Sequence, residues 1–222
     1  QSSTSSDMTT LPVLSLGMNT KEYIYRSTPS WFSVPIYVDF QSSNLPIVVI
    51  ETVNNLSIPS EPKIAANMII VDKGINLRND ISDVTNPDYL DFKGAIKIEV
   101  RGSSSSLLPK KQYALTTYDS LDQKEHVSIL GMPKDNDWIL NGLAYDSSLI
   151  RDYLSYQLSN QIGQYASRGQ YCEVMLNGNY EGIYLFQEKL KADNNRINIK
   201  KIQPADLSSP NLTGGYITKT DK

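Results

Sequence analysis

The sequence predicts an α+β fold, a mostly antiparallel sheet with one main helix. Residues 95–100 alternate apolar and charged side chains, the period of two expected for a strand with one buried face. Asn177-Gly178 stands between two apolar runs, which indicates a tight antiparallel hairpin. Residues 147–162 carry apolar side chains at helical spacing. Together these observations favour a sheet packed against a single helix.

The expected helix begins after Asp146, whose side chain and following serines are typical of an amino-terminal cap. Gly163 marks its end. Its apolar stripe comprises Ile150, Tyr153, Leu154, Leu158 and Ile162. We expect this stripe to pack on the sheet, where burial contributes about 1.5–3 kcal/mol per side chain. Leu154→Asp is therefore expected to unfold the domain.

Short apolar runs between turn residues predict the strands. Residues 46–53 are apolar on both faces and should form a central strand, whereas Pro35 favours a sheet edge for residues 31–40. The expected strands are Trp31–Phe40, Pro46–Val53, Ala65–Val71, Ala95–Val100, a strand from Lys111, Val127–Leu130, Tyr171–Leu176, Gly182–Leu190, Ile197–Ile202 and Gly214–Thr220, with Trp138–Leu140 entering the core.

Composition changes divide the chain into four parts. Residues 1–10 form a flexible Ser/Thr-rich tail, residues 11–72 a β-rich amino-terminal extension, residues 73–93 a polar loop, and residues 94–222 the main folded portion. The aspartates of the polar loop match no calcium-loop spacing, so a solvated loop is favoured over a calcium site.

The charge and the rare residues exclude several functions. Twenty-one basic and 24 acidic side chains give a formal charge of −3, so no global basic field favours nucleic acid. The single cysteine, Cys172, excludes a disulfide framework and is interpreted as a core filler. The single histidine, His126, argues against a histidine-rich metal centre and Ser-His-Asp chemistry. No apolar run reaches the roughly 20 residues of a membrane span.

The start of the chain predicts its location. Gln1 is followed by a run of serines and threonines, as at a mature terminus from which an export signal has been removed. We therefore expect a secreted or cell-surface protein, either free or held by a lipid or signal-derived tether.

One turn collects cations and hydroxyls that suit phosphate. It runs from Arg101 through four serines to Lys110 and Lys111. Alternation along the second strand places Lys111 on the face of Tyr113, and Lys110 on the opposite face. A solvated hairpin tip is the alternative.

Five motifs in order resemble the amino-terminal portion of the spore-coat-protein-H (CotH) kinase-like family. The resemblance covers residues 45–221 and rests on R-G-x-S-S with P-K-K-x-Y, L-G-M-P-K-D-N-D-W-I-L-N-G, D-S-S-L-I-R-D, L-N-G-N-Y-E-G-I-Y-L-F-Q-E-K and T-G-G-Y-I.

The resemblance implies an atypical protein kinase that uses ATP and magnesium to phosphorylate a surface or coat protein. The order of elements agrees with a protein-kinase small lobe, here preceded by the β-rich extension. On this reading Lys111 holds phosphates, Arg151 supplies a helix cation, and Gln187 and Glu188 form the hinge. The turn over the phosphates is shaped by Arg101, Ser103, Ser104, Ser105 and Ser106.

The resemblance assigns no catalytic or metal-binding residue to this chain. Neither H-R-D-x-x-x-x-N nor D-F-G is present, and the family's catalytic and metal-holding aspartates lie beyond residue 222. We therefore expect an inactive, nucleotide-binding half. The alternative is a non-catalytic surface adhesin or coat-assembly module that uses Trp31 and Phe32. Structural roles also remain open for Lys111 as a surface lysine, Arg151 in a helix-surface ion pair and Glu188 at a strand end.

Overall fold

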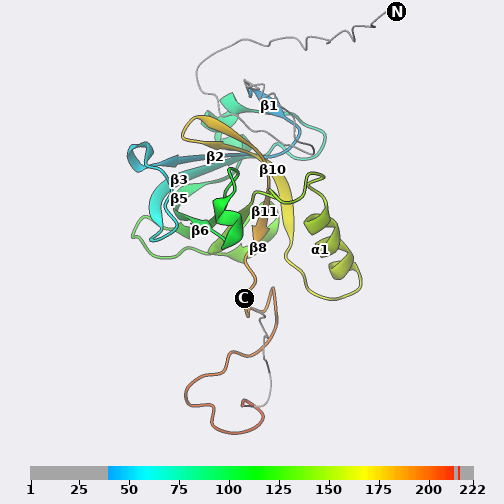
Figure 1. Ribbon diagram of the computed structural model, residues 1–222. Coiled ribbons are helices and arrows are strands. Elements are labelled where there is room, and N and C mark those ends of the chain that lie inside the picture. Colours follow the sequence, from blue (N-terminus) through cyan, green and yellow to red (C-terminus); the bar gives the residue numbers. More distant parts are fainter. Residues whose placement is uncertain (1–39, 213–214, 216–222) are drawn as a thin grey trace, which may run out of the picture.

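Seven strands of the computed structural model, which describes residues 40–212 and 215, close into a barrel (Figure 1). Neighbouring strands are antiparallel except for β10 and β2, whose parallel pairing closes the barrel. The order around the barrel is β10 (Gly169–Leu176), β11 (Asn179–Glu188), β9 (Asp137–Asn141), β6 (Gln112–Tyr118), β5 (Leu90–Arg101), β3 (Ile64–Val71) and β2 (Ile47–Thr52).

The predicted α+β class with a kinase-like small lobe is wrong, because the described residues form a mostly β protein with a closed barrel and one α-helix. The early strands β2 and β3 belong to this barrel: β3 pairs with β5, and β2 pairs with β10 from Ile47↔Glu173 to Ile50↔Leu176. A parallel contact between segments this distant in sequence leaves no local pattern. Closure could therefore not be predicted from alternation alone.

Large apolar and aromatic side chains fill the barrel. Trp138, Leu140 and Phe186 are fully buried, and the Trp138 and Phe186 rings lie 5.6 Å apart. The expected entry of residues 138–140 into the core is confirmed. Cys172 is also fully buried, as a small core side chain should be. Each large side chain contributes about 1.5–3 kcal/mol on burial, so the interior dominates stability.

The predicted hairpin is confirmed between β10 and β11. Asn177 and Gly178 have φ angles of 49° and 75°, the two successive positive values of a type I′ turn. The smaller elements are β1 (Ser42–Ser43), β4 (Asn79–Asp80), β7 (Val127–Ile129), β8 (Met132–Asp135) and the 3-10 helices η1 (Val53–Asn55), η2 (Ile81–Thr85), η3 (Pro87–Tyr89) and η4 (Ser104–Leu107).

Acidic side chains of the polar loop hold its backbone. Asp80 accepts from the Ser82 backbone at 2.9 Å, and Asp83 accepts from the Asp80 backbone at 2.8 Å, which forms a capping box at η2. Asp83 also pairs with Lys73 at 2.5 Å. These carboxylates therefore cap short helices and fix the loop.

The helix α1 (Arg151–Gln161) turns most of the predicted apolar stripe to solvent. Ile150, Leu154 and Leu158 are 53%, 50% and 52% exposed, so the expected packing of this stripe on the sheet is wrong. Tyr153 is the member of the stripe that does pack inward, with its ring centroid 5.0 Å from that of Tyr171. The helix lies beside the barrel (Figure 1) and is attached by polar and aromatic side chains.

The residues predicted to cap and to end this helix, Asp146 and Gly163, do lie at its two ends. Asp146 accepts from the backbone of Arg151 at 2.8 Å, although the helix begins later than expected. Gly163, just past its end, has a φ of 82°.

The strand predicted over residues 197–202 is wrong. This segment makes a single bridge between Ala192 and Ile197 and otherwise has no ladder. The strands expected at residues 31–40 and 214–220, and the tail at residues 1–10, lie outside the described residues, apart from Phe40 and Gly215.

Candidate functional site

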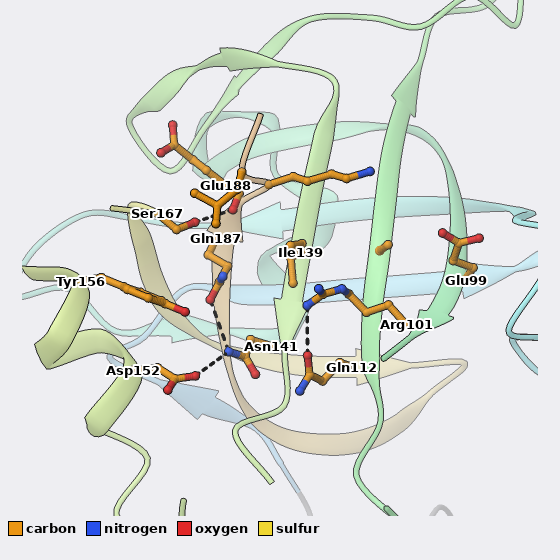
Figure 2. Close-up of a pocket in the computed structure, with 13 residues that line it drawn as sticks. Glu99, Arg101, Gln112, Ile139, Asn141, Asp152, Tyr156, Ser167, Gln187 and Glu188 are labelled. Atoms are coloured by element: carbon orange, nitrogen blue, oxygen red, sulfur yellow. Dashed lines mark hydrogen bonds between the residues drawn. The ribbon is translucent and has the colours of Figure 1, made fainter. Parts of the chain in front are cut away.

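A cleft of about 500 Å³ lies between the outer face of four barrel strands and α1 (Figure 2). Its barrel side is lined by Glu99, Arg101, Gln112, Ala114, Ile139, Asn141 and Gln187, its helix side by Asp152 and Tyr156, and its remaining wall by Ser167, Glu188, Lys189 and Leu190. Binding clefts for small molecules generally enclose about 300–1,000 Å³, so the size suits a ligand such as a nucleotide.

Strand register explains why these side chains share one face. Arg101 pairs with Gln112, and two residues along the strands Glu99 pairs with Ala114. Ala114 also pairs with Ile139, which continues the row to the next strand. Because every second side chain points the same way, these residues all point out of the barrel.

The cleft has an apolar middle and a polar end. Ala114 and Ile139 are buried and adjacent on neighbouring strands, so they offer a flat apolar floor. Arg101 and Gln112 lie one row nearer the turn that carries the serines. This division suits a ligand with a planar apolar part and a polar tail.

Arg101 is a half-buried cation without an acidic partner. Its Nη1 donates to Gln112 Oε1 at 3.1 Å, and it forms no ion pair with any residue that the structure describes. Burial lowers the pKa of its guanidinium, which nevertheless stays protonated at neutral pH. A desolvated cation with only a neutral partner favours an anionic ligand.

Asn141 connects the barrel to the helix. Its Nδ2 donates to Asp152 Oδ2 at 3.1 Å and to Gln187 Oε1 at 3.4 Å (Figure 2). Its Oδ1 accepts from the Leu143 backbone at 3.1 Å. Tyr156 lines the same wall, and burial and the charge of Asp152 raise the pKa of its hydroxyl. These contacts fix one wall of the cleft.

Glu188 is a fully buried carboxylate with several partners. Arg168 binds it through both Nε, at 2.9 Å, and Nη2, at 2.8 Å, while the Tyr165 hydroxyl donates to it at 3.0 Å. Arg196 Nε lies 3.6 Å away. The side chain therefore serves the structure at the end of β11.

A second buried carboxylate, Asp135, holds the segment that follows β11. It pairs with Arg196 and with Lys191, and the Arg196 guanidinium lies over the Trp138 ring at 5.7 Å from its centroid. Between these anchors and β11, residues 189–190 line the cleft and make no backbone–backbone hydrogen bond among the described residues.

The family model described as CotH kinase protein matches residues 98–221, more than half of the chain. The chain belongs to this family. The resemblance stated from the motifs is thus confirmed. No curated protein matches the chain. None of the described helices is long and apolar enough to cross a membrane.

In this CotH-family chain, three of the predicted ligand-binding residues line one cleft. They are Arg101, Gln187 and Glu188. Ser103, Ser104, Lys111 and Arg151 lie outside its lining. Arg151 pairs with Asp146 at 3.6 Å, and its side chain is 77% exposed. Binding of a nucleotide by these residues stays a prediction.

The expected orientations of the two lysines are wrong. Lys111 donates to the Ser106 carbonyl at 2.7 Å, whereas Lys110 is buried, donates to the Ile183 carbonyl and lies 4.6 Å from the Tyr184 ring centroid. The face of Tyr113 is the interior of the barrel, and the cleft lies on the other face. In addition, β6 begins only at Gln112, so strand alternation does not extend to the lysines.

Most of the cleft residues of the CotH-family domain were missed by sequence reasoning, among them four polar ones. Gln112 could have been found, because it alternates with buried Tyr113 and thus faces outward. Asn141 directly follows the apolar run 138–140, which is a weaker indication that its side chain lies at a site. No feature of the sequence indicated Asp152 and Tyr156, because the predicted packing placed Ile150, Leu154 and Leu158 against the sheet.

Proposed function

We propose that this CotH-family chain binds ATP in the cleft beside α1, as the nucleotide-binding part of an atypical protein kinase. The observation that carries the proposal is the guanidinium of Arg101, which lies in the cleft without a carboxylate partner among the described residues. Anionic oxygens of a phosphate would supply the missing partner through charge-assisted hydrogen bonds.

The rest of the cleft fits the other parts of a nucleotide. Ala114 and Ile139 offer an apolar floor for a planar base. The backbone groups of residues 189–190 remain available for hydrogen bonds to the edge of that base. Glu188 would contribute through this backbone turn, because its carboxylate is occupied by Arg168.

Bound ATP would supply the phosphoryl group, and magnesium would accompany it. Glu99 and Asp152 are the acidic side chains that line the cleft apart from buried Glu188. The acceptor that we propose is a coat or cell-surface protein, and we propose that the protein acts outside the cell.

Isothermal titration of the chain with magnesium and ATP tests the proposal. Arg101→Met should weaken binding about tenfold or more, since a hydrogen bond to a charged group contributes about 1.5–3 kcal/mol. Lys111→Ala removes a cation outside the cleft and should change affinity by less than about twofold.

Two results would contradict the proposal. One is equal, small effects of both substitutions, which would place the anion elsewhere. The other is a wild-type chain that binds no ATP, the result expected for the alternative, a non-catalytic adhesin or coat-assembly module.

A further inference from the structure

Gln112 lies beside Arg101 at the polar end of the cleft and contacts it directly. The two residues pair across β5 and β6, and Arg101 Nη1 donates to Gln112 Oε1 at 3.1 Å (Figure 2). Gln112 occupies the unspecified position of the P-K-K-x-Y motif, so neither the motif nor the charge pattern gives it a role. The structure therefore adds a residue to this end of the site.

The hydrogen bond fixes which way the Gln112 amide is turned. A guanidinium has five N–H donors and no acceptor, so the atom that faces it must be the amide oxygen. The amide nitrogen therefore points away from Arg101 in Figure 2. It makes no hydrogen bond with any residue that the structure describes, and because Gln112 lines the cleft, its two hydrogens are available to a partner there.

Two acidic side chains of the cleft, Glu99 and Asp152, do not neutralise Arg101. Glu99, two residues earlier on β5, lies 4.0 Å from Lys63 Nζ. Asp152, on α1, accepts a hydrogen bond from the barrel strand β9 at 3.1 Å. Neither carboxylate forms an ion pair with Arg101 within the described part of the chain. The position from which a carboxylate would reach the guanidinium is that of Gln112, and it holds a neutral amide.

Together, Arg101 and Gln112 present hydrogen-bond donors and no free acceptor. The guanidinium keeps its other N–H groups and its full charge, and Gln112 adds an amide N–H beside it, since the amide oxygen is already occupied. A ligand with several anionic oxygens can bind both groups, whereas a cation finds no acceptor there. Phosphates carry such oxygens and form strong hydrogen bonds with a guanidinium.

We propose that Gln112 determines the specificity of the cleft for an anion: it orients the Arg101 guanidinium, leaves its charge uncompensated, and donates an amide hydrogen to the phosphate oxygens of the bound nucleotide. This inference rests on the proposed function and extends it to a neutral residue. A carboxylate at the same position would accept the same hydrogen bond from Arg101, but it would neutralise the cation and repel the phosphates. The amide orients the cation without this loss of charge.

Gln112→Glu is the sharpest test, because it replaces only the amide nitrogen by an oxygen. In titrations with magnesium and ATP, affinity should fall about 100-fold or more, since the amide donor and the free charge of Arg101 are both lost. Gln112→Met removes the donor but leaves the cation available, and its affinity should fall about tenfold. The thermal unfolding midpoint of Gln112→Glu should stay equal or rise, because an ion pair with Arg101 replaces the neutral hydrogen bond. Lower affinity without lower stability distinguishes a binding role from a structural one.

Gln170→Glu is the matched control. It makes the same change of charge at an exposed position of β10 that does not line the cleft. This variant should bind ATP within about twofold of wild type. Equal, small effects of Gln112→Glu and Gln170→Glu in a chain that binds ATP would overturn the role of Gln112 and leave the proposed function standing.

Inorganic triphosphate, titrated into the same variants, separates the two proposals further. It should lose affinity in Gln112→Glu and Gln112→Met in the same order as ATP, because the expected contact is with phosphate oxygens. If the wild-type chain binds triphosphate with these losses but binds ATP no more tightly, the anion specificity holds and recognition of the nucleotide fails. If the wild-type chain binds neither compound, both proposals fail.

Discussion

Arg196 and Arg101 are both withdrawn from water, but their surroundings differ. The Arg196 side chain is 1% exposed and lies between the carboxylates of Asp135 and Glu188. Arg101 lines an open cleft and meets only the neutral amide of Gln112. The first cation completes a network of the folded chain, whereas the second has capacity for a partner from outside. Burial of a charge therefore indicates a binding site only where its partner is missing.

The network around Arg196 explains how an irregular segment is held. Asp135 and Glu188 belong to β8 and β11, while Lys191 and Arg196 come from the chain after β11. These ion pairs hold the chain just before residues 197–202, where the predicted strand is absent. Removing one member would leave a buried carboxylate without its countercharge.

The largest expected effect comes from breaking this network. Arg196→Met should lower the free energy of unfolding by about 3–5 kcal/mol, the usual cost of removing one partner of a buried ion pair. Urea unfolding followed by tryptophan fluorescence measures it, since the guanidinium lies over Trp138.

Arg101→Met is the matched change in the cleft. It should alter the free energy of unfolding by less than about 1 kcal/mol, because no acidic partner is left behind. Similar destabilisation by the two substitutions would remove the contrast between the two arginines.

A third buried cation, Lys110, extends the comparison to the pH dependence of stability. Burial lowers the pKa of Lys110 to about 8, against smaller opposing effects of Cys172, Glu173 and Glu181. The pKa of a lysine in the unfolded chain is 10.5. At a pH between about 8 and 10.5, the unfolded chain therefore carries a proton on Lys110 that the folded chain lacks. Stability should therefore rise from pH 8 towards pH 10, with a slope approaching about 1.4 kcal/mol per pH unit from this group.

Lys110→Met provides the reference for that measurement. Urea unfolding at several pH values should show the rise for the wild-type chain and a flatter profile for the variant. Identical profiles would mean that Lys110 is not desolvated in the folded chain.

The smallest effect is expected on the outer face of α1. Leu154→Asp should lower the free energy of unfolding by only about 0.5–1 kcal/mol, because Leu154 is 50% exposed and the change mainly reduces helix propensity. Leu140→Ala, in the fully buried core, should cost about 2–5 kcal/mol in the same assay. Unfolding of the domain by Leu154→Asp would restore the packing predicted from the sequence and contradict the observed one.

Local chemistry made several features predictable. The Asn177-Gly178 turn, the cap at Asp146 and the buried run at residues 138–140 each depend on neighbouring residues, and each is present. The polar end of the cleft was only partly foreseen. Arg101 was selected correctly as a cleft residue, but Lys111 was preferred to it because alternation was extended past the start of β6.

The sequence by itself determined most of the barrel strands and the family, because these follow from periodicity, turn chemistry and motifs close together in the chain. Only the tertiary structure decided that the strands close into a barrel, which face became the cleft, and which side of α1 meets it. Those outcomes depend on the β2–β10 pairing and on polar contacts such as Asn141 with Asp152. Their energies arise between distant residues, so no local pattern contains them.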